Sequence, residues 1–377
     1  MSTVVRSYSK INLGLAIGPL QPDGFHGLTT LYQTLELHDL VTVSAVRSAA
    51  TKISLTSNDK RVPTDGRNTC WKMVERALER MGVAAEVAIY IDKRLPVQGG
   101  MGAGSANAAA ALIGLERELG AGPDSGGLTG AERLQLAGEV GSDVPLFLLG
   151  GSVLGLGRGE QVVPLPDMPS VFCVMAIPEV GVSTPQAFRD WDALAEQGTS
   201  GAKAPSIADS DGTAEAVPLT KRDAPDSLTP LGKPDRLNEL SLALAALYAE
   251  PGTSGIIRGS HPGNKQGGSE GTQSSQENDL AENTLLSLVR TGVENDFERV
   301  VFPAYPSLRE IKRQLMGTGS GAAFYAALSG SGSALFGLYR SETDARQAQQ
   351  RVQNAGTKAL MTKTLPRSLY WTRMFAG

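Results

Sequence analysis

The chain has 377 residues and a formal net charge of −4 at pH 7, a length that allows two domains with hydrophobic cores of their own. Hydrophobic residues make up 41% of it and charged residues 20%, as is typical of soluble globular proteins. The slight negative charge gives no indication of a basic surface for nucleic acid, and no apolar run is long enough to span a bilayer. Cys70 and Cys173 lie far apart and in no metal-binding or CxxC spacing, which argues against a disulfide framework. We therefore expect a cytoplasmic protein that acts on a small molecule and binds neither nucleic acid nor membrane.

Strand-like and helix-like segments alternate in the first third of the chain. Three segments rich in β-branched and apolar residues predict strands, at 4–17, 40–46 and 87–91. Between the first two, Gln21-Pro22-Asp23-Gly24 predicts a turn, because proline presets φ and glycine accepts the left-handed region. Apolar spacing predicts an amphipathic helix over 68–81. A glycine-rich loop and a helix to about residue 119 follow the third strand.

The composition changes at about residue 196. From there to residue 279 the chain is dense in Gly, Ser, Pro, Asp and Lys, and Tyr248 is its only aromatic residue. Such a segment buries too little apolar surface to offset its ordering entropy. We therefore expect a flexible insertion at about 196–279, with helical spacing only at 237–248. A regulatory or partner-binding role for it stays open beside that of a plain linker.

Regular elements return after the insertion. The pattern predicts helices over 280–301 and 308–316. Residues 326–339 then predict a strand, a glycine turn and a second strand, and no internal repeat is visible.

The strongest local signal is the glycine-rich loop Leu95–Asn107. Its glycines let the backbone approach an anion closely, and the helix after it presents a positive dipole end. Ser105 lies where that helix is expected to begin, so its hydroxyl is placed to cap the helix or to reach a phosphate oxygen or a metal ion. The loop lacks the Gly-Lys-Ser/Thr of a Walker A motif. A strand, a glycine loop and a helix in this order predict a phosphate site, with a glycine turn that binds nothing as the alternative.

Three further segments carry polar residues in apolar surroundings. Lys10 and Asn12 share one face of the first strand, which indicates either a polar site or a strand edge in water. The segment Gly141–Pro145 places Asp143 either as a helix cap or as an ionised catalytic group beside a cation. The glycine turn Leu328–Ser333 is either a plain β-turn or a second wall against a triphosphate.

These loops, in this order and separation, resemble the three motifs of the GHMP kinase group, which includes galacto-, homoserine, mevalonate and phosphomevalonate kinases. The segments that carry the resemblance are Ser9–Leu13, Gln21–His26, Leu95–Asn107, Gly141–Phe147, Gly150–Glu160, Val182–Phe188 and Asn295–Pro306. Gln21–His26 is similar to a turn found only in the members that act on a cytidyl diphosphate-linked methylerythritol. Four residues depart from the pattern of those members: Phe25 for tyrosine, Gln98 and Ala103 for glycine, and Ala106 for serine.

The resemblance implies a two-domain α+β fold with the active site in the cleft between the domains. The first domain, resembling domain 2 of ribosomal protein S5, would span 1–165. The second, an α/β-sandwich, would span 166–377 and carry the insertion. The sequence leaves the oligomeric state open, a homodimer included.

By the same resemblance, Asp143 would accept the proton of the substrate hydroxyl, and Lys10 would lie beside it. ATP would be bound by Pro96, Gly99, Gly100, Met101, Gly102, Ala103, Gly104, Ser105, Asn68, Ser329, Gly330 and Ser331, with Ser105 near Mg²⁺. The acceptor, a cytidyl diphosphate-linked methylerythritol, would be bound by Asn12, Phe25, His26, Thr184, Pro185 and Phe188. Two alternatives stay open: a GHMP kinase for another small alcohol, such as homoserine or mevalonate, and a non-catalytic binding protein with this fold.

Overall fold

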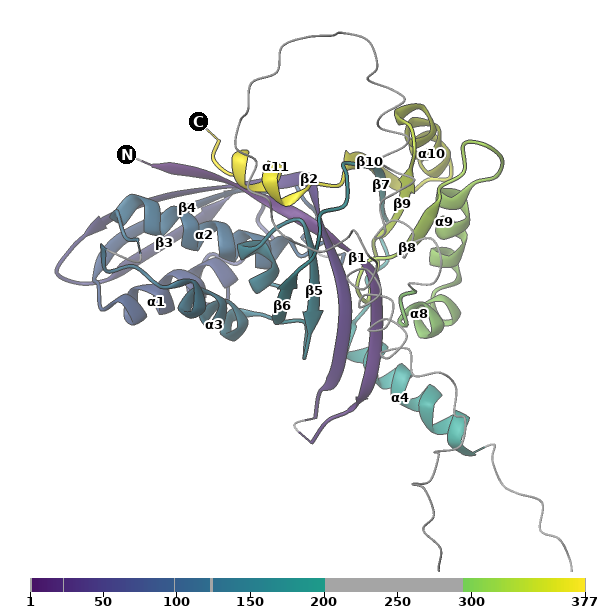
Figure 1. The fold of residues 1–377 in the computed structure, drawn as a ribbon, viewed down its shortest axis with the longest axis horizontal. Coiled ribbons are helices and arrows are strands. Elements are labelled where there is room, and N and C mark those ends of the chain that lie inside the picture. The colour runs from purple at the N-terminus through teal and green to yellow at the C-terminus, as the bar shows by residue number, and fades with distance from the viewer. Residues whose placement is uncertain (1, 23, 98, 123–124, 201–293, 377) are drawn as a thin grey trace, which may run out of the picture.

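The computed structural model describes residues 2–22, 24–97, 99–122, 125–200 and 294–376. Asp23, Gln98 and most of the expected insertion, with its helical segment at 237–248, lie outside the described residues. Figure 1 shows two lobes that meet where the long strands β1 and β2 cross the molecule.

The first lobe is built on a six-stranded sheet. Its strands are β1 (Thr3–Leu20), β2 (His26–Arg47), β3 (Lys52–Ser57), β4 (Ala85–Asp92), β5 (Ser152–Leu156) and β6 (Gln161–Pro164). They follow the order β3-β4-β2-β5-β6, and β1 pairs with β2. The β3–β4 pair is parallel and the other pairs are antiparallel.

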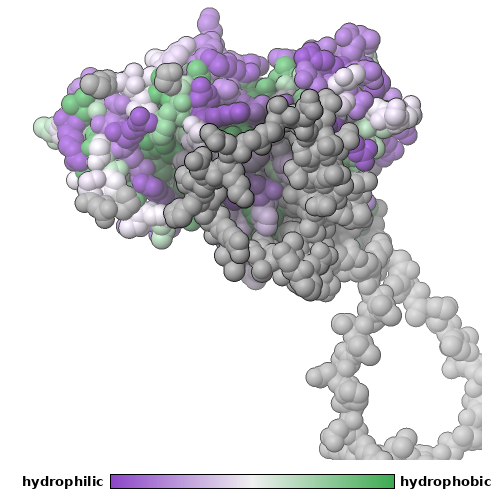
Figure 2. Space-filling view, turned by 45° about the horizontal axis from the view of Figure 1, so that its top comes forward, coloured by the Kyte–Doolittle hydropathy of each residue, from purple (hydrophilic) through white to green (hydrophobic). Residues whose placement is uncertain are grey.

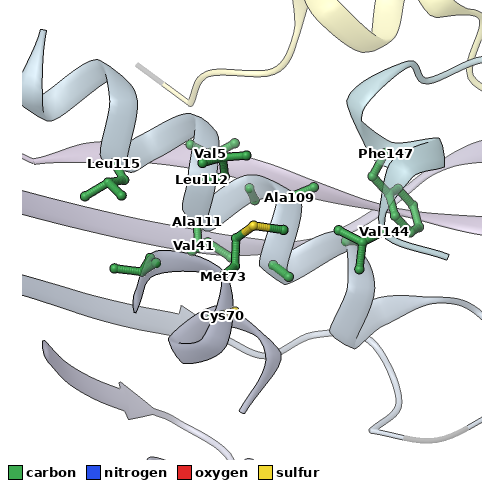
Figure 3. Packing of buried hydrophobic residues seen from close by; sticks show 14 of the residues in the cluster. Val5, Val41, Cys70, Met73, Ala109, Ala111, Leu112, Leu115, Val144 and Phe147 are labelled. Atoms are coloured by element: carbon green, nitrogen blue, oxygen red, sulfur yellow. The ribbon is translucent and has the colours of Figure 1, made fainter. Parts of the chain in front are cut away.

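Three helices cover one face of this sheet (Figure 1): α1 (Thr69–Met81), α2 (Ala103–Leu119) and α3 (Gly130–Val140). The alanines of α2 let its backbone approach the strands, and a Cβ on Gly114 would lie 2.7 Å from Val43 Cγ2. Figure 3 shows Leu112 of α2 in the core with Val5 of β1 and Met73 of α1. This core fixes where the N-terminus of α2 lies relative to β1.

The second lobe is built on a four-stranded antiparallel sheet of order β10-β7-β9-β8. Its strands are β7 (Phe172–Ile177), β8 (Tyr325–Leu328), β9 (Leu335–Tyr339) and β10 (Lys358–Lys363). The helices of this lobe are α4 (Thr184–Ser200), α8 (Glu298–Ala304), α9 (Pro306–Met316) and α10 (Glu342–Asn354).

Both faces of β7 are buried, because alternate side chains enter different cores. Val174 packs with the helices of the second lobe. Met175 instead packs in a cluster with Ile11 and Leu13 of β1 and with Phe336 of β9. The two lobes therefore share a hydrophobic core along β1.

The C-terminal residues return to the first lobe. Helix α11 (Arg367–Thr372) lies beside β1 (Figure 1), and Tyr370 and Met374 are buried in the same cluster as Phe147. The division after residue 165 stays our prediction of the domain boundary, with the addition that this tail packs on the first core.

The expected α+β class is confirmed, and so are the strand at 4–17, within β1, and the helix at 68–81, which is α1 with Asn68 as its N-cap. The strand expected at 40–46 was too short, because β2 begins at His26. The first half of β2 contains buried polar residues such as Gln33 and Thr34, so it lacks the apolar pattern from which a strand is predicted. Neither β3 nor α3 was expected from the sequence.

The insertion bounds of about 196–279 stay a prediction, and the helix expected after it was wrong in where it begins. Helix α4 continues through Ser200, so the regular structure does not end at residue 196. The helix expected over 280–301 is described only from residue 294, and α8 begins at Glu298. Before it, Asn295 forms a β-bridge with Leu15, and the Asp296 backbone N–H donates to the Leu15 carbonyl.

None of the helices in the described part of the chain is both long and apolar enough to cross a membrane. On the face shown in Figure 2, hydrophilic residues gather over the second lobe, whereas hydrophilic and hydrophobic residues mix over the first.

Candidate active site

Lys10 and Asp143 meet between the two lobes. Lys10 lies in the middle of β1, with a side chain only 3% exposed, and its Nζ is 3.2 Å from Asp143 Oδ2. Asp143 follows α3 and precedes a short 3₁₀ helix, η2 (Pro145–Leu148), whose N-cap is Val144 and which has no side-chain cap. Asp143 therefore does not cap that helix, and the alternative of an ionised group beside a cation fits its surroundings.

A chain of hydrogen bonds orients the Lys10 ammonium group. Its Nζ donates to Asn12 Oδ1 at 2.6 Å, and Asn12 Nδ2 donates to Thr30 Oγ1 at 2.7 Å. Lys10 and Asn12 thus share one face, as alternation along the strand predicted. Because all three residues are buried, the ammonium group has little freedom to leave the carboxylate.

Tyr32 is a site residue that the sequence analysis missed. Its Oη donates to Asp143 Oδ1 at 2.9 Å, and burial together with the Asp143 charge raises the pKa of Tyr32 well above 10. The phenol therefore stays a neutral donor. In the sequence, Thr30, Tyr32 and Thr34 alternate along one segment, but the pairing of Tyr32 with Asn12 across β1 and β2 is visible only in the structure.

The glycine-rich loop and the turn between β8 and β9 are held together by hydrogen bonds. Ser329 Oγ donates to the Gly100 carbonyl at 3.0 Å, and the Ala334 backbone N–H donates to the Gly99 carbonyl at 3.3 Å. Gly100 has a φ of 76°, and a Cβ there would overlap the Ser329 carbonyl oxygen. Only glycine allows this approach.

The loop also lies directly against Lys10. The Lys10 backbone N–H donates to the Met101 carbonyl at 3.0 Å. A Cβ on Gly102 would lie 3.0 Å from Lys10 Cγ. The backbone that would approach a phosphate is thereby fixed next to the lysine and the carboxylate.

Ser105 does not cap α2. That helix begins at Ala103 with Gly102 as its N-cap and has no side-chain cap, so the capping alternative for Ser105 was wrong. Ser105 lies in the first turn, and a Cβ on Gly141 would be 4.0 Å from its Oγ. Its hydroxyl therefore faces the segment that carries Asp143.

Asn68 caps α1 through its amide oxygen, and its amide nitrogen ties the helix start to the preceding loop. Its Oδ1 accepts from the Cys70 backbone N–H at 2.8 Å, and its Nδ2 donates to the Pro63 carbonyl at 2.7 Å. The next residue, Thr69, donates from Oγ1 to the Gly104 carbonyl at 2.8 Å. Asn68 is thus positioned near the start of α2, while its contact with a nucleotide stays a prediction.

A cavity of about 700 Å³ opens beside Lys10 and Asp143. Among the residues expected in the site, those that line it are Lys10, Asn12, Phe25, His26, Gly100, Asp143, Thr184, Pro185, Phe188, Gly330 and Ser331. The others do not line it: Asn68, Pro96, Gly99, Met101, Gly102, Ala103, Gly104, Ser105 and Ser329. These belong to the loop, to the starts of α1 and α2, and to the turn that closes on the loop.

Aromatic side chains gather at the end of the cavity away from Lys10. The rings of His26 and Phe188 are stacked, with centroids 5.3 Å apart and planes 6° apart. His26 Nε2 lies 2.9 Å from Asp192 Oδ1. Phe25 is 51% exposed, and the guanidinium carbon of Arg158 lies 3.7 Å from its ring centroid. Neither Arg158 nor Asp192 was expected in the site: Arg158 lies within one of the segments that carry the resemblance but is not one of its motif glycines, and Asp192 lies outside those segments.

Thr184 and Ser331 join α4 to the β8–β9 turn, since their hydroxyl oxygens are 2.6 Å apart. The turn itself is held from behind by Asn295, whose Nδ2 donates to the carbonyls of Leu328 at 2.9 Å and Gly330 at 2.7 Å. The β8–β9 turn, which forms this wall of the cavity, is therefore held by hydrogen bonds to both Thr184 and Asn295.

Two family models match the chain. Residues 68–151 match the N-terminal domain of GHMP kinases, and residues 278–358 match their C-terminal domain. The first match includes the glycine-rich loop and Asp143.

Relatives with curated names extend these matches over most of the chain. The chain is 30% identical over 359 residues to a kinase of Moorella thermoacetica, a match that covers 95% of this chain and 98% of the relative. It is 43% identical over 197 residues to a kinase of Nocardia farcinica, and that match spans 62% of the relative's length. In fold, a crystal structure of 4-(cytidine 5'-diphospho)-2C-methyl-D-erythritol kinase is similar with a TM-score of 0.59 at 24% identity, covering 96% of this chain and 99% of that one.

The chain therefore belongs to the GHMP kinase family, and the expected two-domain GHMP kinase fold is confirmed. It is an ATP-dependent phosphotransferase. The relatives from both organisms are named 4-diphosphocytidyl-2-C-methyl-D-erythritol kinase.

Proposed function

We propose that this protein phosphorylates a hydroxyl group of 4-diphosphocytidyl-2-C-methyl-D-erythritol with ATP, a step in the formation of isoprenoid precursors. The observation that carries the proposal is the Lys10–Asp143 pair, at 3.2 Å, beside a cavity of about 700 Å³. The name of the relative matched over 98% of its length supports the choice of acceptor.

In the proposed reaction, the acceptor hydroxyl oxygen forms a bond to the γ-phosphorus of ATP while the bond from that phosphorus to the β,γ-bridging oxygen breaks. ADP leaves with the bonding electron pair, and the hydroxyl proton passes to the Asp143 carboxylate. Because the transition state of phosphoryl transfer is loose, the protein contributes mainly positioning and charge stabilisation. Lys10 supplies a buried positive charge beside both the carboxylate and the transferring group.

The glycine-rich loop is proposed to bind the triphosphate. The close approach of Gly100 to the Ser329 carbonyl and of Gly102 to Lys10 leaves backbone, not side chains, to line the loop, and the N-terminus of α2 adds its positive dipole end. Gly99 to Ser105 would form one wall, and Ser329 to Ser331 the other.

Mg²⁺ is proposed to accompany the triphosphate, because this ion takes oxygen ligands and keeps several waters. The donor that fits is the Ser105 hydroxyl, which faces Gly141. Bound there, the ion would neutralise charge on the phosphates. The protein groups would still set the position of the hydroxyl and of its proton.

The aromatic end of the cavity suits a cytosine ring. A planar base stacks on aromatic faces, and Phe25, His26 and Phe188 all line this end of the cavity. The replacement of tyrosine by Phe25 keeps the face and removes only a hydroxyl. Asn12 and Thr184 lie between this end and Lys10, where the erythritol and diphosphate would pass.

Two alternatives compete with this proposal. Homoserine or mevalonate would serve as acceptor in other GHMP kinases, but neither has a ring for the Phe25–Phe188 end. A non-catalytic binding protein would not need Lys10 and Asp143 in contact. The fold alone does not distinguish these acceptors, because GHMP kinases for different alcohols share it.

An ADP-release assay with ATP and Mg²⁺ tests the proposal. Purified protein should release ADP with 4-diphosphocytidyl-2-C-methyl-D-erythritol at a rate far above that with homoserine or mevalonate. Faster turnover of either of these two alcohols would overturn the choice of acceptor. ATP binding without ADP release, with all three, would favour the binding protein.

A further inference from the structure

The Asp143 carboxylate is held from two sides by different residues. Oδ2 faces Lys10 Nζ at 3.2 Å, and Oδ1 accepts a hydrogen bond from Tyr32 Oη at 2.9 Å. Lys10 Nζ also lies 5.4 Å from the centroid of the Tyr32 ring. Tyr32 therefore contacts both members of the pair to which the reaction is assigned.

Tyr32 itself has a single orientation. Its side chain is 2% exposed and lies in a slot formed by two glycines. A Cβ on Gly155 would be 2.5 Å from Tyr32 Cε2, and a Cβ on Gly159 would overlap Oη. The backbone around these glycines leaves room for the phenol and directs its oxygen at Asp143.

Because Oδ1 accepts the Tyr32 hydrogen bond and Oδ2 forms the ion pair with Lys10, the carboxylate cannot rotate about its Cβ–Cγ bond without breaking one of these contacts. Hydrogen bonds to an ionised group are about twice as strong as neutral ones, and buried donors left unpaired are costly. The remaining lone pairs of Asp143 are thereby held in one direction, while its side chain is still 31% exposed and lines the cavity.

We propose that Tyr32 is a positioning residue, whose hydroxyl fixes the Asp143 carboxylate in the orientation that receives the proton of the acceptor hydroxyl. This inference rests on the proposed function, because it assigns a role within that reaction. It adds a residue that no motif marks. The proton passes from the acceptor to Asp143, and the Tyr32 proton stays on Oη throughout.

The first test is Tyr32→Phe, which removes the hydroxyl and keeps the ring in its slot. We expect kcat to fall about tenfold to a hundredfold, as for the loss of a hydrogen bond to a charged group, while the KM values for ATP and for the acceptor stay near wild type. Tyr339→Phe is the matched control. It removes another buried tyrosine hydroxyl, which donates to the Leu315 carbonyl at 2.7 Å in the second lobe, and should leave kcat unchanged.

A second test separates positioning from general support of the fold. Asp143→Glu keeps a carboxylate but displaces it from Tyr32 Oη. If Tyr32 acts through Asp143, adding Tyr32→Phe to Asp143→Glu should lower kcat by a much smaller factor than adding it to the wild type, because the effects of coupled residues are not additive. If Tyr32 only supports the fold, Tyr32→Phe should lower kcat by the same factor in the wild type and in Asp143→Glu. That result would overturn the inference.

Two further outcomes would overturn it. These are a wild-type kcat in Tyr32→Phe, and an effect mainly on the KM for the acceptor, which would make Tyr32 a substrate contact. The failure of the proposed function is distinguishable from both. If the wild type prefers another alcohol, the same variants are measured with that alcohol, and only a wild type that turns over none of them removes both proposals.

Discussion

At the scale of single residues, the site depends on one buried cation and one partly exposed carboxylate. Lys10 lines the cavity, but its side chain is only 3% exposed and is held in place because Asn12 and Thr30 continue its hydrogen bonds into the strand pair. Asp143 keeps access to the cavity. This asymmetry suits a fixed positive charge that stabilises the transferring group and a carboxylate that exchanges a proton with the substrate.

Asp143→Asn should separate chemistry from binding. The amide keeps the shape of the side chain but loses the charge and the ability to accept a proton. We therefore expect kcat to fall roughly a hundredfold or more, with ATP affinity, measured by calorimetry, close to wild type. Asp190→Asn, on α4, is the control and should keep the wild-type rate. An unchanged rate in Asp143→Asn would remove Asp143 from the mechanism.

At the scale of elements, the glycine-rich loop and the β8–β9 turn form one unit. Each loop uses backbone groups of the other, through the Ser329–Gly100 and Ala334–Gly99 hydrogen bonds. One loop belongs to the first lobe and the other to the second. The wall proposed to bind the triphosphate therefore exists only when both lobes are folded together.

Gly100→Ala tests this unit. The new Cβ would overlap the Ser329 carbonyl oxygen, and the residue has a φ of 76°, so one loop must move. We expect the free energy of unfolding in urea to fall by about 1–3 kcal/mol and the KM for ATP to rise.

Gly138→Ala is the matched control for that substitution. Its Cβ would make only an ordinary contact, 3.7 Å from Glu160 Cβ, inside α3. Alanine in a helix interior should raise stability by about 0.5–1 kcal/mol. An unchanged KM for ATP in Gly100→Ala would contradict the assignment of this loop to the nucleotide.

At the scale of the whole molecule, the C-terminal tail ties the second half of the chain to the segment behind Asp143. Tyr370 Oη donates to the Phe147 carbonyl at 2.5 Å, and Trp371 Nε1 donates to the Leu149 carbonyl at 3.0 Å. Tyr370 also packs so closely on Gly150 that a Cβ there would overlap its ring. The tail therefore supports the turn that carries the carboxylate.

Tyr370→Ala should show this coupling. Removing a large buried ring is expected to lower the free energy of unfolding by about 3–5 kcal/mol and to reduce kcat as the segment at Phe147 relaxes. Trp371→Ala, which removes a side chain that is 41% exposed, should lower the free energy of unfolding by less. Chemical unfolding and kcat at a temperature where both variants are folded give the comparison. A full loss of stability with unchanged kcat would show that the tail does not act on the site.

Much of the candidate site was predictable, and the reason differs from residue to residue. Phe25, His26, Thr184 and Phe188 were expected from short segments that resemble a family, and the structure brings them to one cavity. Tyr32 and Arg158 were not expected, because each matters only through a partner distant in sequence. One alternative for Ser105 was a helix cap, but the helix begins two residues earlier, at Ala103, with Gly102 as its N-cap.

The sequence by itself determined the local geometry: the glycines of the loop Leu95–Asn107, a helix after that loop, and the alternation that puts Lys10 and Asn12 on one face. These follow from preferences of neighbouring residues. Only the tertiary structure decided that Asp143 sits between Lys10 and Tyr32, and that the two glycine turns close on each other. Such contacts depend on the register of β1 on β2 and on how the two lobes pack, and a slip of one residue in that register would turn Lys10 to the opposite face.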